Sequence, residues 1–354
     1  MDKDKVYQTL ASHLDRLPAG FPKTETGVEI RILKRLFTPE EAALAQLVTL
    51  KPETAEEIAS RTGRDAEELA SRLQIISRKG LVFRLGRGDK IRYMAANFIV
   101  GIWEFNVNRL DPELINDVGE YVPHYLGQSH NLKTPQLRTI PISKALPAEQ
   151  AVMPYEEARR IILEQEKIIV APCICRKEHK IMGKGCDKRM EACLVFGIGA
   201  QYYEENGLGR PILQAEALSI LNEAENQGLV LQPSNTQKVV NICMCCGCCC
   251  QILKNLKRLP NPARYAASNY FAVSDRELCT GCGTCIERCQ MDAIEMNGDT
   301  AEIKSGQCIG CGLCVPTCPV GAMSLNLKPE KERSVPPSDR MEAFKRLAEN
   351  RVAR

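Results

Sequence analysis

The sequence predicts a multidomain α+β protein. An N-terminal domain of helices with a β-wing is expected to precede a mixed α/β middle domain and a C-terminal α+β domain. Three observations support this division: helix signals followed by a hairpin occur before residue 110, prolines accumulate over residues 111–153, and all 18 cysteines come after residue 172. A length of 354 residues also suggests two or three domains.

Residues 1–24 are predicted to form an N-terminal helix. Val6, Leu10 and Leu14 recur at helical spacing, and the pattern ends at Pro18. We expect this helix to dock on the domain that follows it.

Residues 25–110 contain three helix signals and a hairpin signal. Thr38 is a predicted N-cap followed by Pro39 at the first helical position, a second short helix follows Thr54, and a third runs from Asp65 until Gly80 ends it. Two short apolar stretches then flank a glycine-containing turn at residues 86–89. This order resembles the winged helix-turn-helix family, which implies contact with DNA or with another protein.

The charges in this domain disfavour DNA. The third helix begins with Asp65, Glu67 and Glu68, which have the wrong sign to face phosphates. The wing is basic, with Arg84, Arg87, Lys90 and Arg92. Over residues 25–110, however, 14 Lys and Arg stand against 12 Asp and Glu, so the domain lacks the basic surface of a DNA module. We therefore expect it to dock on a protein, with DNA as the disfavoured alternative.

The remaining segments outside the cysteine-rich regions are a connector and a tail. Residues 111–153 contain prolines at intervals and are expected to form an extended, stiff connector. Residues 328–354 are expected to form a charged tail with a short helix, in which Met341, Phe344 and Leu347 make an apolar docking face.

Residues 154–265 form the predicted cysteine-rich middle domain. Its ten cysteines are Cys173, Cys175, Cys186 and Cys193, followed by Cys243, Cys245, Cys246, Cys248, Cys249 and Cys250. So many free thiols would be an oxidation hazard without a metal, and we therefore expect at least one further iron-sulfur cluster here. The simplest ligand set is the first four, with Cys243, Cys245 and Cys246 as rivals or partners. A zinc site and a redox-active dithiol are the alternatives.

Local patterns place the middle cysteines only in part. Residues 167–171 are predicted to form a strand that leads to Cys173, and residues 190–205 a helix that carries Cys193. If the run 243–250 is extended, neighbouring side chains alternate between faces, so only some of its six cysteines can bind one metal. Six Lys and Arg side chains surround the first four cysteines, and they favour thiolates or steer an acidic partner.

The C-terminal domain, residues 268–327, repeats the spacing C-x-x-C-x-x-C-x-x-x-C. The first copy is Cys279, Cys282, Cys285 and Cys289, and the second is Cys308, Cys311, Cys314 and Cys318. Structural zinc sites are built from pairs of C-x-x-C units, and they do not contain a third cysteine at the same spacing followed by C-x-x-x-C. Between the copies, Asn297 and Gly298 predict the turn of a small hairpin.

The double run resembles the bacterial two-[4Fe-4S] ferredoxin family. The resemblance implies crossed ligand sets, because the fourth cysteine of each run binds the other cluster. One cluster is then held by Cys279, Cys282, Cys285 and Cys318, and the other by Cys308, Cys311, Cys314 and Cys289. Gln290 departs from the pattern, since proline usually follows the fourth cysteine. Its presence is expected to alter the hydrogen bonding near that cluster without preventing ligation.

These features favour an iron-sulfur electron-transfer protein with two [4Fe-4S] clusters and a further cluster. No dinucleotide-binding, phosphate-binding or catalytic motif is found, so we expect a subunit or adaptor of an oxidoreductase system, with a redox protein as partner. A DNA-binding redox regulator is the alternative, and a reductase acting at the middle cysteines is a second one. With no apolar run long enough for a membrane span and no signal-like start, a cytoplasmic location is expected.

Overall fold

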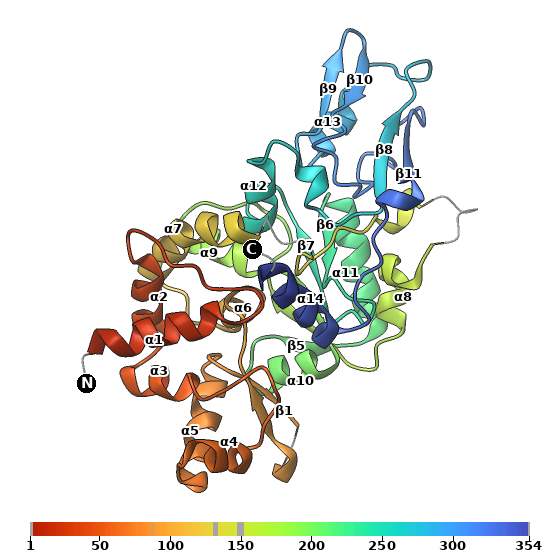
Figure 1. Ribbon diagram of the computed structural model, residues 1–354. Helices are drawn as coiled ribbons and strands as arrows, with labels where there is room; N and C mark the ends of the chain where they lie inside the picture. Colours follow the sequence, from red (N-terminus) through yellow and green to blue (C-terminus); the bar gives the residue numbers. More distant parts are fainter. Residues whose placement is uncertain (1–2, 87, 130–133, 147–151, 353–354) are drawn as a thin grey trace. The chain divides into compact units, whose positions relative to one another are not determined.

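A computed structural model describes residues 3–86, 88–129, 134–146 and 152–352. The chain divides into two compact units (Figure 1). Unit 1 comprises Met1–Asn131, Ile198–Arg210 and Leu347–Arg354, and unit 2 comprises Leu132–Gly197 and Pro211–Arg346. The protein is thus mixed α+β. None of the helices in the described ranges combines the length and the apolar character needed to cross a membrane.

Unit 1 is mainly helical. Its helices are α1 (Lys3–Asp15), α2 (Val28–Leu36), α3 (Pro39–Ala45), α4 (Ala55–Thr62), α5 (Ala66–Arg78), α6 (Trp103–Phe105), α7 (Pro112–Ser129) and α10 (Gly197–Glu205), and its strands are β1 (Phe83–Leu85) and β2 (Arg92–Met94). Local sequence explains the helix starts: Thr38 and Thr54 each form a capping box with the glutamate three residues later. The strands β1 and β2 pair antiparallel.

The hairpin is less basic than its sequence indicates. Arg84 is buried, with 3% of its surface exposed, and its guanidinium contacts Glu205 at 2.7 Å and Ser77 at 2.6 Å. Arg92 pairs with Glu57 at 2.8 Å. Arg87 lies outside the described residues. The predicted basic wing is therefore wrong for Arg84, because the residue folds inward to an acidic partner from α10.

The predicted extended connector is wrong over its first half. Residues 112–129 form the helix α7, with Pro112 at its start and Pro123 inside it. Leu114, Val118 and Tyr121 recur at helical spacing and are buried, and this burial outweighs the prolines. From residue 134 the chain is irregular and bridges to β6 (Val230–Pro233). Residues 130–133 and 147–151 of the predicted connector lie outside the described part.

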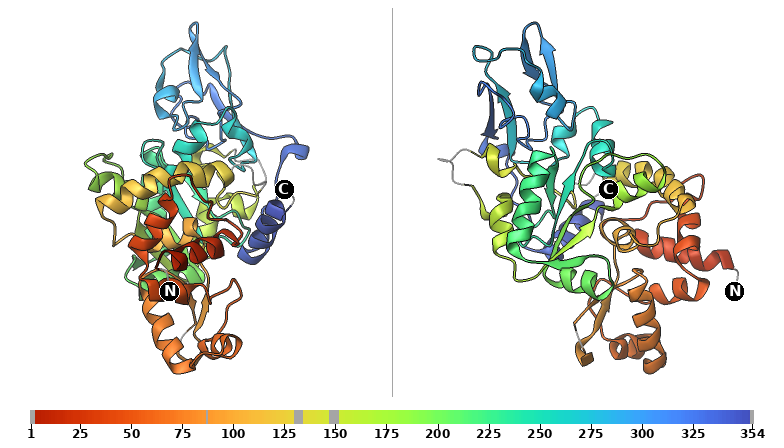
Figure 2. Two further views of the ribbon diagram at one scale, coloured as in Figure 1. Left: turned by 60° about the vertical axis from the view of Figure 1, so that its left-hand side comes forward. Right: turned by 180° about the vertical axis from the view of Figure 1, so that it is seen from behind.

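Unit 2 contains a five-stranded sheet in the order β5-β3-β4-β7-β6. Its further strands are β5 (Arg210–Ile212), β3 (Ile168–Pro172), β4 (Glu191–Phe196) and β7 (Asn241–Cys245). The pairs β3–β4, β4–β7 and β6–β7 are antiparallel. The helices α8 (Ala158–Leu163) and α11 (Gln214–Asn226) pack together beside the sheet, as Figure 2 shows, and α9 (Ile174–Ile181) follows β3.

The predicted helix over residues 190–205 is wrong in its first part. Residues 191–196 form β4, so Cys193 lies in a strand, and the helix α10 begins only at Gly197. Alternating apolar residues, including Ala192 and Leu194, explain the strand. Gly197 has a φ of 56°, a conformation that ends the strand before the helix.

The C-terminal part of unit 2 consists of two antiparallel strand pairs. β8 (Tyr270–Ser274) pairs with β11 (Met323–Leu327), and β9 (Ile294–Asn297) pairs with β10 (Thr300–Ile303). The predicted hairpin at Gly298 is confirmed. The helix α12 (Gln251–Lys257) precedes these strands, and α13 (Thr284–Arg288) lies between β8 and β9. The predicted helix of the tail is α14 (Arg340–Val352).

A single apolar core joins this part to the five-stranded sheet. Val170 of β3 and Leu194 of β4 belong to it together with Ile309 and Leu325 of the C-terminal part. The sequence separates residues 154–265 from 268–327, whereas the structure packs them within one unit. The arrangement matters for function, because it brings two sets of cysteines into the same body.

Candidate metal centres

Two tight loops carry the first three cysteines of each C-terminal run. Gly281 and Gly310 occupy equivalent places in these loops, with φ values of 69° and 68°. A Cβ at Gly281 would lie 2.5 Å from the carbonyl oxygen of Asp299, and one at Gly310 would lie 2.1 Å from that of Tyr270. Only glycine allows both the left-handed backbone and the close approach. The loops are therefore wrapped against the neighbouring strands.

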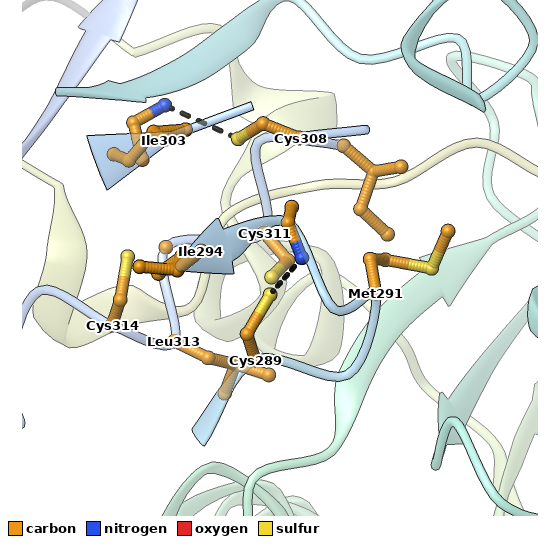
Figure 3. A pocket seen from close by; sticks show the side chains of 12 residues that line it. Cys289, Met291, Ile294, Ile303, Cys308, Cys311, Leu313 and Cys314 are labelled. Atoms are coloured by element: carbon orange, nitrogen blue, oxygen red, sulfur yellow. Dashed lines mark hydrogen bonds between the residues drawn. The ribbon is translucent and has the colours of Figure 1, made fainter. Parts of the chain in front are cut away.

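One cavity is lined by four cysteine thiols. Figure 3 shows Cys289 beside Cys308, Cys311 and Cys314, and apolar side chains such as Met291, Ile294 and Leu313 complete the lining. Three of these cysteines come from the second run and one from the first. This is the set that the ferredoxin resemblance implies for one of the two clusters. The thiols and the apolar lining fit an iron-sulfur cluster.

The other four C-terminal cysteines lie at the first loop and after the second. Burial raises the pKa of Cys285, and the nearby Cys279 and Cys282 raise it further, so these three lie close together. The sulfur of Cys318 accepts a hydrogen bond from the Ala322 N–H at 3.2 Å.

Four backbone N–H groups donate to sulfurs of the two C-terminal runs at 3.2–3.4 Å. Besides Ala322, the donors are Ala293 to Cys289 at 3.3 Å, Ala301 to Cys279 at 3.3 Å and Ala272 to Cys308 at 3.4 Å. Ala293 and Ala322 each lie four residues after the last cysteine of their run, whereas Ala272 and Ala301 lie on the strands β8 and β10. Such bonds stabilise negative charge on the sulfurs and so adjust the potential of a bound cluster.

Burial shifts several of these thiols toward the protonated form. Burial raises the pKa of Cys289 and Cys311, and together with neighbouring thiols it raises the pKa of Cys314 to about 12. Metal ligation requires thiolates, so binding of iron releases protons here.

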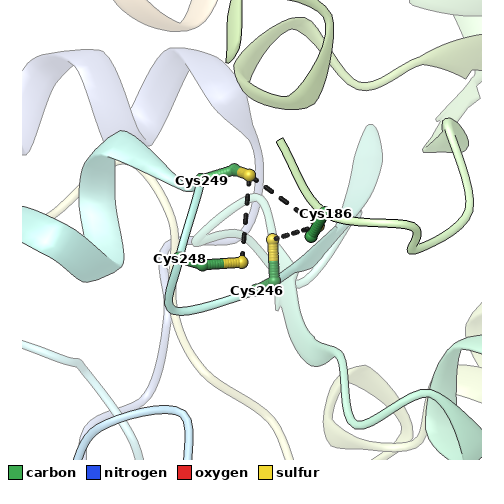
Figure 4. A group of neighbouring side chains, drawn as sticks. All are labelled: Cys186, Cys246, Cys248 and Cys249. Carbon is green, nitrogen blue, oxygen red and sulfur yellow. Dashed lines mark hydrogen bonds between the residues drawn. The ribbon is translucent and has the colours of Figure 1, made fainter. Parts of the chain in front are cut away.

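A second site lies in the middle of the chain, where four thiols converge. The sulfurs of Cys186, Cys246, Cys248 and Cys249, here called the four-thiol group, all lie within 4.8 Å of one another (Figure 4). Cys186 contacts Cys246 at 3.9 Å and Cys249 at 3.8 Å, and Cys248 contacts Cys249 at 3.8 Å. Three members come from one turn after β7, and Cys186 comes from a loop 60 residues earlier.

The other six middle cysteines form a chain of thiol contacts, here called the six-thiol group. Neighbouring thiols shift one another's pKa along the series Cys173, Cys175, Cys250, Cys245, Cys243 and Cys193, so consecutive members lie close together. Strand geometry explains part of this grouping. Cys243 and Cys245 are two residues apart on β7, and Cys193 on β4 pairs directly with Cys243.

Two side-chain amides lie against the six-thiol group. Asn241 Nδ2 donates to the Cys243 sulfur at 3.7 Å, and Gln232 Nε2 donates to the Cys250 sulfur at 3.8 Å. Like the backbone donors of the C-terminal part, they favour negative charge on sulfur.

Arg176 lies between the two thiol groups and is only 2% exposed. Its Nη atoms donate to the carbonyl oxygens of Arg189 at 2.8 Å and Met244 at 2.6 Å, and its Nε finds no partner in the described part of the chain. Burial lowers the pKa of Arg176, but thiols of both groups, Cys173 first and then Cys246, outweigh burial and raise it. No carboxylate forms an ion pair with it among the described residues. Cys246, whose pKa Arg176 lowers, is therefore the neighbouring thiol best placed to balance this guanidinium as a thiolate.

The structure distributes the predicted middle cysteines between two groups. Cys173, Cys175 and Cys193 lie in the six-thiol group with Cys243 and Cys245. Of the other predicted residues, Cys186 and Cys246 lie in the four-thiol group. The expected simplest set is thus split, since β3 and β4 direct three of its members to one place and the loop at Cys186 leads to another.

Three further cysteines were missed as candidate ligands. Cys248, Cys249 and Cys250 all contact other thiols. The C-x-x-C spacing of Cys246 and Cys249 was the available signal. It was obscured because the chain leaves the extended conformation after Cys245 and turns.

Gln290 connects the C-terminal part with the four-thiol group. Its side-chain Oε1 accepts a hydrogen bond from the Gly247 N–H at 2.8 Å, and Gly247 lies between Cys246 and Cys248. A Cβ at Gly247 would lie only 2.3 Å from the Gln290 carbonyl oxygen. Since Gln290 directly follows Cys289, the two cysteine-bearing loops are in backbone contact. A proline at 290 has no side-chain acceptor for this bond.

Comparison with known proteins identifies the C-terminal part. Residues 272–325 match the family described as a 4Fe-4S dicluster domain. No curated protein and no solved structure matches the chain significantly. The chain therefore carries a C-terminal ferredoxin-like iron-sulfur domain, and its many cysteines agree with an iron-sulfur protein.

Proposed function

We propose that this protein transfers electrons through two [4Fe-4S] clusters and one further iron-sulfur cluster, as a subunit or adaptor of an oxidoreductase system. The observation that carries the proposal is the cavity lined by Cys289, Cys308, Cys311 and Cys314 within the segment that matches a dicluster domain. When bound, such clusters gain and lose single electrons.

The chain's own residues support that role by holding the sulfurs and their charge. Cys279, Cys282, Cys285 and Cys318 make the proposed second ligand set. The N–H groups of Ala272 and Ala293 favour the more negative, reduced state of the set that includes Cys289.

The six-thiol group is the proposed site of the further cluster. Six neighbouring thiols are more than the four that one cluster needs, and the side-chain amides of Asn241 and Gln232 donate to two of their sulfurs. The buried positive charge of Arg176 favours an anionic metal-thiolate group beside it. Packing of both cysteine regions in one unit favours an electron relay over two independent modules.

The N-terminal unit is proposed to bind a redox protein through a winged-helix-like domain. DNA binding is disfavoured because Arg84 and Arg92 of the hairpin are already paired with Glu205 and Glu57. The first turn of α5 carries Glu67 and Glu68, and Glu68 is paired with Arg72, so acidic side chains stand at that helix start. A redox-dependent regulator remains the second candidate, favoured only by the three helices and hairpin.

Iron and acid-labile sulfide quantitation after anaerobic purification tests the proposal. We expect about twelve irons per chain, of which about eight belong to the C-terminal domain. A value of about eight would overturn the further cluster, and a value below about four would overturn the dicluster assignment. Salt-dependent binding to mixed genomic DNA fragments, measured in oxidised and reduced protein, separates relay from regulator. We expect no binding beyond that of a neutral control protein in either state.

A further inference from the structure

We propose that the four-thiol group, Cys186, Cys246, Cys248 and Cys249, binds a single zinc ion in a tetrahedral tetrathiolate site. This inference does not depend on electron transfer, because it concerns a different group of cysteines from those assigned to the clusters.

The distances between sulfurs carry the argument. Four thiolates at about 2.3 Å from a zinc ion form a tetrahedron whose edges are about 3.8 Å long. The sulfur of Cys186 lies 3.9 Å from that of Cys246 and 3.8 Å from that of Cys249, and the sulfurs of Cys248 and Cys249 are 3.8 Å apart. Three of the six sulfur separations thus match the edges of such a tetrahedron, and all six are below 4.8 Å.

The C-terminal cysteines provide an internal comparison. A cubane cluster binds its cysteines on four separate iron atoms, so their sulfurs lie further apart than sulfurs on one ion. Within the described residues, no second group of three or more potential ligands is as compact as the four-thiol group. The sulfurs of the eight cysteines in the dicluster domain lie further apart than those of the four-thiol group. This difference in spacing distinguishes a site for one ion from a site for a cluster.

Local structure explains why these four residues converge. Cys246 and Cys249 have the C-x-x-C spacing of zinc ligands. The turn after β7 allows Cys248 and Cys249 to contact each other although they are adjacent. Cys186 supplies the fourth thiol from the loop between α9 and β4.

The surrounding charge suits an anionic tetrathiolate. A zinc ion with four thiolates has a net charge of about −2. Arg176 is buried, it lowers the pKa of Cys246, and its Nε has no partner in the described part. Lys257 lies beside Gly247 and pairs with Asp292 at 2.7 Å. A buried guanidinium without a carboxylate is costly unless an anion lies next to it, and the metal-thiolate group supplies that anion.

The position of the site indicates a structural role. The metal would tie the loop at Cys186 to the turn at Gly247, and Gly247 bonds Gln290 next to Cys289. All four positions around the ion are taken by protein thiols, which is the arrangement of closed, structural zinc sites. The ion would thus hold the turn against which the dicluster domain packs.

Metal analysis of the full chain tests the site. We expect about one zinc per chain in the wild type, and X-ray absorption at the zinc edge should give four sulfur neighbours at about 2.3 Å. Cys248→Ser is the main variant, because Cys248 is exposed and its replacement disturbs packing least. It should lose the zinc and keep the C-terminal iron. Cys193→Ser, in the six-thiol group, is the matched control and should keep the zinc.

Three results would overturn the proposal. They are a wild-type protein without zinc, a zinc edge with nitrogen or oxygen neighbours in place of four sulfurs, and a Cys248→Ser variant that loses iron while zinc stays. If Cys248→Ser fails to fold, the wild-type absorption spectrum decides alone. Substitution by cobalt gives an independent readout, since a tetrathiolate cobalt site has an intense sulfur-to-metal charge-transfer spectrum that Cys248→Ser should remove.

Discussion

Replacing Gly247 by alanine should destabilise the contact between the two cysteine-bearing loops. The added Cβ would lie 2.3 Å from the Gln290 carbonyl oxygen, closer than the roughly 3.0 Å that such atoms keep. Both partners are backbone, so neither can move aside by changing a rotamer. The loops must separate, and the Gly247 N–H bond to Gln290 Oε1 lengthens or breaks.

The expected cost follows from these two terms. Overpacking costs about 1–3 kcal/mol, and a lost hydrogen bond costs about 0.5–1.5 kcal/mol. Together they lower the free energy of unfolding by about 2–4 kcal/mol, which corresponds to a fall of about 5–15 °C in the apparent Tm of a unit of this size.

Gly185→Ala is the matched control for this experiment. Gly185 directly precedes Cys186, and its nearest atoms to an added Cβ are 3.8 Å away. Thermal unfolding of the anaerobic holoprotein, followed by circular dichroism, compares both variants with the wild type. Gly185→Ala should be neutral or slightly stabilising. The reasoning is refuted if Gly247→Ala melts within about 2 °C of the Gly185→Ala variant.

Three further changes test other parts of the structure. Ala272→Pro removes the N–H that donates to the Cys308 sulfur and should lower that cluster's potential by about 20–65 mV in an EPR-monitored titration, whereas Ala272→Gly should not. Arg176→Met should weaken zinc binding at the four-thiol group by about 10–100-fold in a chelator competition. Unchanged zinc affinity would show that Arg176 does not balance the negative charge of the metal-thiolate group. Hydrogen bonds from Arg61 lower the pKa of Glu53, so Glu53→Gln should cost about 1–2 kcal/mol at pH 7. A carboxyl group whose pKa is lowered by folding stabilises the folded state at pH values above its ordinary pKa, near 4.5. The difference in the free energy of unfolding between the wild type and Glu53→Gln should therefore shrink as the pH is lowered below 4.5.

The C-terminal domain was predictable because its signals are local. The spacing of Cys279, Cys282 and Cys285 fixes a loop within seven residues, and the turn at Gly298 fixes a hairpin within ten. Short-range patterns of this kind need no knowledge of the rest of the fold. The match to a 4Fe-4S dicluster domain agrees with that prediction.

The middle cysteines could not be sorted in the same way. Cys186 meets Cys246 across 60 residues, and their convergence depends on how the loop after α9 packs on the turn after β7. The strand that carries Cys193 was mistaken for a helix, which hid its pairing with Cys243. Sequence therefore indicated a metal-binding region but not the division of its thiols.

Proline content was a misleading signal in the N-terminal half. Pro112 and Pro123 suggested an extended connector, but Val118 and Tyr121 show that the apolar repeat of α7 is the stronger determinant. Gln290 is the opposite case. Its departure from the ferredoxin pattern was visible in the sequence, whereas its partner, Gly247, became evident only from the fold.

The most direct test of electron transfer is an EPR-monitored redox titration of the anaerobically purified full chain. The account predicts reversible one-electron reduction of two [4Fe-4S] clusters, with broadened signals from their magnetic interaction. Loss of the reducible signal of one cluster in a Cys311→Ser variant would assign that cluster to the cavity with Cys289. A protein that shows no reducible iron-sulfur signal, although its iron and sulfide are present, would contradict the account.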